Sequence, residues 1–164
     1  MKKYIKPILL GLAAILLLAQ FIRPAKNQSN VLTNNISKKY PVPDSVQAIL
    51  QVACNDCHSN NTVYPWYAEV QPVASWLAQH VEEGKGELNF SNFTARSVAV
   101  QNHKFEEIIE MVKEGEMPLA SYTWIHRDAI LTEAQKQRLI DWAQMNMDSL
   151  KAQYPADSLV LRRK

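Results

Sequence analysis

Apolar residues recur at helical spacing in four segments of the chain, and no segment shows the strict alternation of a β-strand. The pattern predicts helices near residues 44–53, 72–84, 103–114 and 132–150. The apolar stripes, in helix order, are Val46, Ile49, Leu50 and Ala53; Val73, Trp76, Leu77, His80 and Val81; Phe105, Ile108, Ile109 and Val112; and Leu139, Trp142, Ala143, Met147 and Leu150. We therefore expect an all-α domain of about four helices.

Residues with special backbone preferences stand at the ends of these helices. Two pairs have the spacing of a capping box, at the starts of the first and fourth helices: Asp44 with Gln47, and Thr132 with Gln135. Gly84 and Gly115 are placed to end the second and third helices. Residues 59–71 and 86–102 then form long loops, and loops of that length need something to pack against.

A different pattern opens the chain. Lys2, Lys3 and Lys6 precede residues 8–22, which are apolar apart from one glutamine. As a helix, these 15 residues span about 22 Å, which is short for a hydrocarbon core of about 30 Å. Residues 1–23 are predicted to be a membrane anchor or an export signal. We favour an uncleaved anchor, because the run contains no clean small-x-small cleavage site.

The rest of the chain divides into three parts by composition. Residues 24–41 are polar with two prolines and read as a linker, and residues 42–150 contain the helical domain. Residues 151–164 form a C-terminal tail that ends in three basic residues, Arg162, Arg163 and Lys164. We expect the domain on the periplasmic side of an inner membrane, or free in the periplasm if the first segment is cleaved.

Charge and composition exclude one class of partner. The chain has 18 basic and 16 acidic residues, and four of the basic residues lie within residues 1–23. The remainder is therefore slightly acidic and has no clustered basic surface of the kind that nucleic acid requires. Hydrophobic residues make up 47% of the chain, which is enough for an ordinary buried core.

The strongest chemical signal is the run Cys54-Asn-Asp-Cys57-His58, which contains the only two cysteines of the chain. C-x-x-C-H is the attachment sequence of c-type haem. Thiols three residues apart on one turn can reach two neighbouring vinyl groups of a porphyrin, and the adjacent histidine then lies beneath the ring as the proximal iron ligand. We expect one haem c, attached through both cysteines.

A sixth iron ligand is predicted in the loop before the last helix. Met117 is followed by Pro118, whose fixed φ helps to hold such a loop. A thioether is a soft neutral ligand that raises the reduction potential of haem iron. His80, His103 and His126 are the alternative ligands, and an open sixth position is a further alternative.

Aromatic residues are plentiful, and most are expected to serve the core. The four tryptophans are Trp66, Trp76, Trp124 and Trp142. One or two of them should line the haem, because a porphyrin needs a largely apolar cavity. Tyr64, Trp66 and Tyr67 follow the attachment sequence closely and are the best candidates for that wall.

Together these residues resemble the haem-binding domain family of exported bacterial proteins, whose domains are similar to small monohaem cytochromes c. The resemblance covers about residues 42–143 and rests on Cys54–Asn61, Tyr64–Tyr67, Leu88–Phe93, Gly115–Pro118, Leu131-Thr132 and Asp141–Ala143. It implies a helical domain wrapped around one haem. It also implies that Cys54 and Cys57 carry the haem and that His58 and Met117 bind the iron.

These observations favour a non-catalytic carrier that moves single electrons outside the cytoplasm, held at the membrane by its N-terminal helix and serving unidentified redox partner proteins. An enzyme or gas sensor with an open haem face is the main alternative. A haem-free thiol redox protein or a zinc protein is a further alternative. The thiol reading lacks the strand that normally precedes such a pair, and a zinc site wants a fourth ligand.

Overall fold

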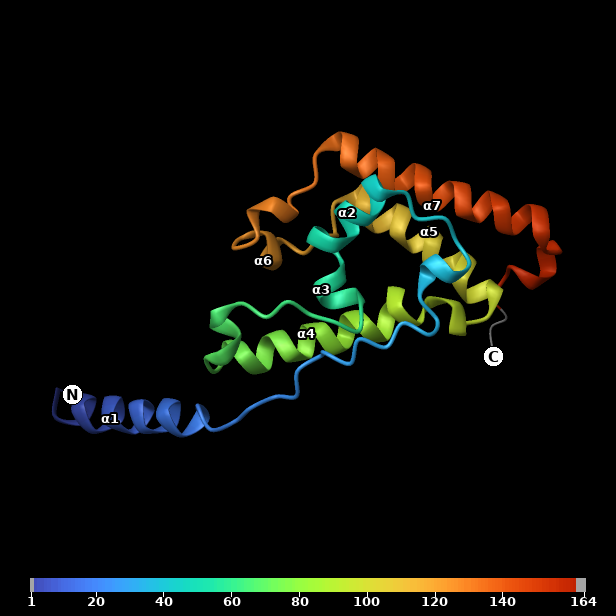
Figure 1. Cartoon of the computed structure of the whole chain (residues 1–164). Coiled ribbons are helices and arrows are strands. Elements are labelled where there is room, and N and C mark those ends of the chain that lie inside the picture. The colour runs from blue at the N-terminus through green and yellow to red at the C-terminus, as the bar shows by residue number, and fades with distance from the viewer. Residues whose placement is uncertain (1, 162–164) are drawn as a thin grey trace.

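The computed structural model describes residues 2–161, and within that range it is all-α, as the sequence predicts. The α-helices are α1 (Lys2–Ala19), α2 (Asp44–Ala53), α3 (Asn55–His58), α4 (Val73–Glu87), α5 (Val98–Glu114), α6 (Ala120–Thr123) and α7 (Glu133–Gln153) (Figure 1). Short 3₁₀ turns join them: η1 (Ile36–Lys38), η2 (Trp66–Glu69), η3 (Phe90–Ala95), η4 (Arg127–Ala129) and η5 (Ala156–Ser158). The four predicted helices are α2, α4, α5 and α7, and the short helices α3 and α6 are additional.

The core lies where α5 packs along α7, with α2 across one end (Figure 1). Phe105 of α5 is fully buried, and its ring centroid lies 5.0 Å from those of Tyr40 and Phe93. The ring of Trp142 from α7 lies 5.6 Å away on the other side, in an edge-to-face arrangement. Such aromatic contacts add to the stabilisation from burial alone.

Three of the four predicted stripes are confirmed. The buried residues are Val46, Ile49, Leu50 and Ala53 of α2; Phe105, Ile108 and Val112 of α5; and Leu139, Trp142, Ala143, Met147 and Leu150 of α7. The stripe of α4 is wrong in part, because Val81 is buried whereas Trp76 is 45% exposed. Since α4 is covered mainly by α3 and η2, much of its surface stays open.

Helix ends agree with the sequence in two cases. Thr132 and Gln135 form the expected capping box, in which the hydroxyl of Thr132 accepts from the Gln135 amide and the Gln135 side chain accepts from the Thr132 amide. Gly115 ends α5 in the left-handed conformation, at φ 77°. The helix α5 starts earlier than expected, however, because the side chain of Ser97 caps it ahead of Val98.

Two predicted helix ends are wrong. The Asp44–Gln47 capping box does not form, because Asp44 is the first residue of α2 and Pro43 occupies the capping position. Gly84 does not end α4, which continues to Glu87. The two stretches expected as long loops are interrupted by η2 and η3. Ala68 of η2 is buried, and so is Phe90 of η3.

Residues 24–41, the predicted linker, make contacts with the domain. The backbone of Asn27 accepts from the Thr62 amide, and its side-chain amide donates to the Ser59 carbonyl. Further along, Ile36 is only 3% exposed and Tyr40 only 4%. This segment is therefore part of the folded unit, while the domain boundaries themselves stay predictions. At the other end Leu159 is buried, and the basic residues 162–164 lie outside the described residues.

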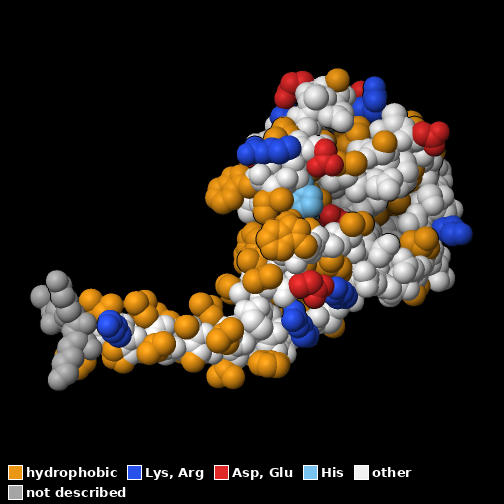
Figure 2. Space-filling model, turned by 60° about the vertical axis from the view of Figure 1, so that its left-hand side comes forward, with side chains coloured by type: hydrophobic (Ala, Val, Ile, Leu, Met, Phe, Trp, Pro, Cys, Tyr) orange, Lys and Arg blue, Asp and Glu red, His pale blue; other side chains and the backbone are white. Residues whose placement is uncertain are grey.

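The N-terminal helix α1 extends away from the domain, and its apolar side chains are exposed along its length (Figures 1 and 2). Its end is joined to the domain, because the side chain of Gln20 exchanges hydrogen bonds with the backbone of Gln71. Within residues 2–161 no helix has the length and apolar character needed to cross a membrane, so the expected N-terminal membrane helix is unsupported.

Candidate haem site

Residues Cys54 to His58 form one compact turn, which we name the attachment turn. The helix α2 stops at Ala53, Cys54 leaves the helical conformation at φ −130°, and α3 follows at once. The Cys54 carbonyl accepts from the amides of Cys57 and His58, at 3.2 and 2.9 Å. Both thiols are free, and both belong to this single turn.

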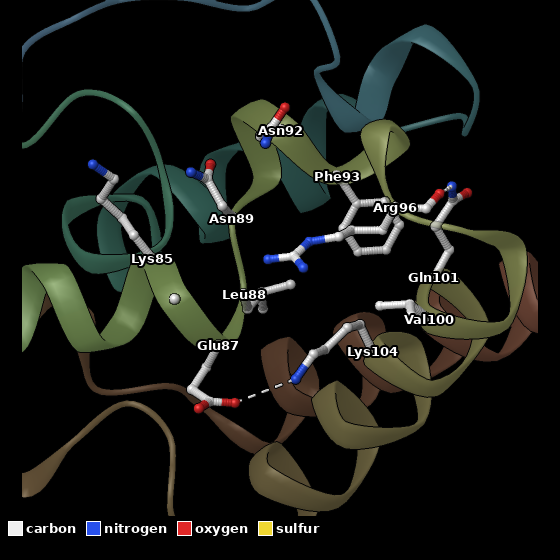
Figure 3. Close-up of a pocket in the computed structure, with 11 residues that line it drawn as sticks. Lys85, Glu87, Leu88, Asn89, Asn92, Phe93, Arg96, Val100, Gln101 and Lys104 are labelled. Atoms are coloured by element: carbon white, nitrogen blue, oxygen red, sulfur yellow. Dashed lines mark hydrogen bonds and ion pairs between the residues drawn. The ribbon is translucent and has the colours of Figure 1, made fainter. Parts of the chain in front are cut away.

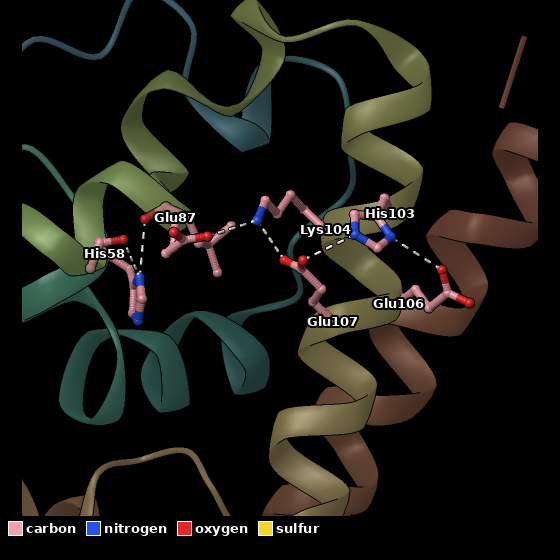
Figure 4. A network of polar contacts seen from close by, with 8 residues as sticks. His58, Glu87, His103, Lys104, Glu106 and Glu107 are labelled. Carbon is pink, nitrogen blue, oxygen red and sulfur yellow. Dashed lines mark hydrogen bonds and ion pairs between the residues drawn. The ribbon is translucent and has the colours of Figure 1, made fainter. Parts of the chain in front are cut away.

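The histidine of the attachment turn is held in a defined orientation. Its Nδ1 lies 2.9 Å from the Gly84 carbonyl and 3.0 Å from the Leu88 carbonyl (Figure 4). Carbonyl oxygens only accept, so Nδ1 must carry the proton and Nε2 is left with a free lone pair. Burial lowers the pKa of His58, which favours the neutral ring. A neutral imidazole with a fixed tautomer is the form that binds iron.

A glycine allows α4 to come this close to the attachment turn. A Cβ atom at Gly84 would lie 2.8 Å from the Cys57 carbonyl oxygen and 3.0 Å from the Cys57 Cβ. Any larger residue would therefore push the two helices apart. Sequence reasoning took Gly84 for a helix end and missed this role. The available signal was a glycine inside an otherwise helical pattern, which often marks close packing.

Met117 lies in the loop between α5 and α6 and is half-buried. Its amide donates to the Met111 carbonyl at 3.1 Å, so the loop turns back on the end of α5. The loop leads into α6, where the hydroxyl of Tyr122 donates to the Asp56 carboxylate at 2.8 Å. The structure thus brings the segment after Met117 against the attachment turn, and ligation of iron by the Met117 sulfur stays a prediction.

Two of the alternative histidine ligands are engaged with other aromatic residues. His80 of α4 is tilted over the ring of Trp76, and its Nδ1 lies 3.1 Å from the Trp76 carbonyl. His126 stacks on Tyr122 with centroids 4.1 Å apart, and its Nε2 lies 2.7 Å from the Tyr67 hydroxyl. Each ring thus has a partner that already orients it.

The third alternative, His103, lies on α5 away from the attachment turn. Its two ring nitrogens lie 3.4 Å from Glu106 and 3.1 Å from Glu107 (Figure 4). It is 39% exposed and belongs to a row of ion pairs along the surface of α5. These contacts hold the ring at the surface of α5.

The geometry does not support the two haem-free alternatives, a thiol redox protein and a zinc protein. Burial raises the pKa of Cys54 to about 12 and that of Cys57 to about 11, whereas redox thiols have a lowered pKa. Within residues 2–161 no strand precedes the pair, and no three His, Cys, Asp or Glu side chains are grouped closely enough to hold a metal ion.

Comparison with known proteins identifies the family. The family model described as a haem-binding domain matches residues 14–145, which is most of the chain. The chain belongs to the haem-binding domain family. This membership shows that it binds haem. No curated protein and no solved structure matches the chain.

The residues of this haem-binding domain fit the group that its family implies. Two free thiols and an imidazole with an available Nε2 share one turn. At Gly84 the helix α4 packs directly against Cys57 of that turn. The ring of Phe90 lies edge-on to His58, with centroids 6.5 Å apart. Covalent haem attachment uses two thiols, which add to the vinyl groups of the porphyrin, and a neutral imidazole, which binds the iron.

Three of the four tryptophans are exposed at the surface of the haem-binding domain. Trp66 and Trp124 are 80% and 74% exposed, and Trp76 is also open to solvent, so of the four tryptophans only Trp142 is confirmed as core. Figure 2 shows hydrophobic side chains gathered around a histidine on one face of the domain. Trp66 lies edge-on to Tyr67, next to the half-buried Tyr64. That these residues line the haem stays a prediction.

Two cavities lie in the domain, and one of them is lined in part by Asn55 and Asp56 of the attachment turn. One, of about 260 Å³, lies on the carbonyl side of His58, between the end of α4, η3 and the start of α5 (Figure 3). Its basic residues are Lys85, Arg96 and Lys104, and Lys104 is paired with Glu87 at 3.4 Å. The other, of about 370 Å³, is lined by asparagines and by Asp56. The first is mainly polar and therefore poorly suited to a porphyrin. The second also has apolar side chains in its wall, Leu50 and Phe90 among them.

Proposed function

We propose that this haem-binding domain is a c-type electron carrier. Cys54 and Cys57 would hold one haem through thioether bonds, and His58 and Met117 would bind its iron. The observation that supports this most directly is the His58 ring, whose Nδ1 is held by two backbone carbonyls while Nε2 keeps its lone pair, on the turn that carries both free thiols. An imidazole oriented in this way is prepared for a permanent iron bond.

Each group of the proposed site has a separate role. When bound, haem supplies a one-electron iron couple. The carbonyls of Gly84 and Leu88 fix the tautomer of His58 and make its Nε2 a better donor. Met117 offers a soft neutral sulfur that favours the reduced iron. Because His58 and Met117 would both bind the iron, the group would serve electron transfer and not substrate binding.

We also propose that the domain works outside the cytoplasm, where covalent haem attachment takes place. The support is residues 1–23, in which lysines precede a helix of exposed apolar side chains. This segment would export the protein and hold it at the membrane, close to redox partner proteins. Cell fractionation combined with N-terminal sequencing of the mature protein tests this, and a cytoplasmic protein with its first residues intact would contradict it.

The test of covalent attachment uses the two thiols. We expect the matured protein to show haem staining on a denaturing gel, and the double variant Cys54→Ala, Cys57→Ala to lose that staining. The protein band detected by antibody serves as the loading control. Staining that survived in the double variant would overturn the attachment.

The test of electron transfer is a voltammogram of the matured protein. A reversible one-electron couple and a low-spin ferric spectrum are expected. After reduction, the ferrous spectrum should not change when carbon monoxide is added. A high-spin ferric spectrum with rapid carbon monoxide binding would instead identify an open-faced haem and would contradict the carrier.

A further inference from the structure

One hydrogen bond between side chains fastens the loop of Met117 to the attachment turn. The hydroxyl of Tyr122 donates to Oδ2 of Asp56 across 2.8 Å, and it also lies 3.3 Å from the Val52 carbonyl. Asp56 is one of the two residues between the cysteines, so this bond reaches the turn itself. We name the pair the Asp56–Tyr122 clasp.

On the attachment side of the clasp, Asp56 has a fixed orientation. Its other carboxylate oxygen, Oδ1, accepts from the Val63 amide at 3.0 Å. Its backbone carbonyl accepts from the hydroxyl of Thr62 at 2.6 Å, and Thr62 is buried. Because both carboxylate oxygens have partners, the acceptor is held in one direction. Hydrogen bonds to a carboxylate are among the stronger ones in proteins.

On the loop side, Tyr122 is held just as firmly. Its ring stacks on His126 at an interplanar angle of 7°, and His126 is bonded in turn to the Tyr67 hydroxyl. Burial, together with the neighbouring Asp56, raises the pKa of Tyr122, so its phenol stays a donor at neutral pH. The segment is thus attached to α3 through Asp56 and to η2 through Tyr67.

Met117 therefore lies on a short span that is fixed at both ends. The helix α5 ends at Gly115, where the backbone turns into the left-handed region. Five residues after Met117 the chain reaches Tyr122 and the clasp. Ordering a loop costs conformational entropy, and a contact that already holds its far end reduces the cost of placing its middle.

We propose that Asp56 and Tyr122 are positioning residues that hold Met117 in place as the sixth iron ligand. This inference rests on the proposed function. A thioether carries no charge and binds iron through sulfur alone, so its retention depends on how well the loop is ordered. Without the clasp, the loop would open and an external ligand would displace Met117 more easily.

The experiment uses the oxidised, matured protein and imidazole as the competing ligand. The weak far-red absorption band of the sulfur–iron bond is followed as imidazole is added. We expect Tyr122→Phe to bind imidazole about tenfold to a hundredfold more tightly than the unmodified protein, the range for losing a hydrogen bond to a charged group. Asp56→Asn keeps an acceptor oxygen without the charge, so its affinity for imidazole should lie between those of the unmodified protein and Tyr122→Phe. If Tyr122→Phe fails to mature, Asp56→Asn is compared with the unmodified protein instead.

Tyr40→Phe is the matched control. It also removes a tyrosine hydroxyl that donates to a side chain, here Gln101, but it does so in the core between η1 and α5. Imidazole affinity should be unchanged in this variant. Equal imidazole affinities in the unmodified protein and Tyr122→Phe would overturn the clasp and leave Met117 ligation intact. If the unmodified protein lacks the far-red band and Met117→Ala has the same spectrum, ligation by Met117 fails and the clasp fails with it.

Discussion

At the scale of single residues, Gly84 serves the packing of two helices and not the flexibility of the chain. It stands within α4 against the Cys57 backbone, where a Cβ atom would be 2.8 Å from oxygen. Gly86, two residues later in the same helix, has nothing within 4 Å of its Cβ position. The two glycines are therefore a matched pair, one sterically required and one not.

Gly84→Ala is expected to lower the free energy of unfolding by about 1–3 kcal/mol, the usual effect of forcing atoms into a packed interior. Gly86→Ala should leave it unchanged or raise it by up to about 1 kcal/mol, because alanine is the better helix former. Chemical denaturation followed by circular dichroism measures both. Equal stabilities would contradict the close approach of α4 to the attachment turn.

A second residue, Tyr40, should make the stability depend on alkaline pH. Burial raises its pKa above the ordinary value, with a smaller contribution from Tyr154, so the folded state favours the neutral phenol. Its stabilising contribution is complete below about pH 10, the ordinary tyrosine pKa, and is lost as the pH rises above that value. We expect Tyr40→Phe to flatten the fall of unfolding free energy above about pH 10. Tyr4→Phe, at an exposed position, should keep the original slope, and equal slopes for both variants would disprove the assignment.

At the scale of elements, the helices that pack most deeply were the ones that could be predicted. The stripes of α5 and α7 are periodic because both helices bury one whole face against each other. The start of α7 was also predictable, since a capping box is local in sequence. The start of α2 was not, because Pro43 takes the capping position ahead of Asp44. Gly84 misled the sequence reading because its reason lies in another helix.

The cap of α7 gives a direct test at this scale. Thr132→Ala should lower the free energy of unfolding by about 1 kcal/mol, because the amide of Gln135 loses its acceptor. Asp44→Ala should have a smaller effect of a few tenths of a kcal/mol, since Asp44 makes no capping bond and contributes only through the helix dipole. Thermal unfolding of the two variants compares them. A larger loss at Asp44 would reverse our assignment of the two helix starts.

At the scale of the whole molecule, residues 24–41 belong to the folded unit. Their apolar side chains are too scattered to show a period, yet Ile36 and Tyr40 are anchored in the core. The candidate site shows the same division. The motif residues Cys54, Cys57 and His58 could be proposed as site residues from sequence because their spacing is local. The Gly84 and Leu88 carbonyls and the Tyr122 partner of Asp56 were not, since backbone acceptors and distant contacts leave no local pattern.

Ile36→Ala should therefore lower the free energy of unfolding of the whole domain by about 2–4 kcal/mol, as for other large-to-small changes in a core. Val31→Ala, in the same segment but 54% exposed, should change it by less than about 0.5 kcal/mol. Denaturant titrations give both values. Little loss at Ile36 would show that the segment rests on the surface without adding to the fold.

The two carbonyls that hold His58 have an electrical consequence as well. Gly84 lies in the last turn of α4, and Leu88 is the residue that caps this helix. This is the end of a helix where unsatisfied carbonyls concentrate partial negative charge. In the proposed carrier, that charge would act on the imidazole through Nδ1 and stabilise positive charge on the bound iron. The end of α4 would then favour the ferric state, whereas the proposed thioether ligand favours the ferrous state, and the reduction potential would reflect the balance of the two.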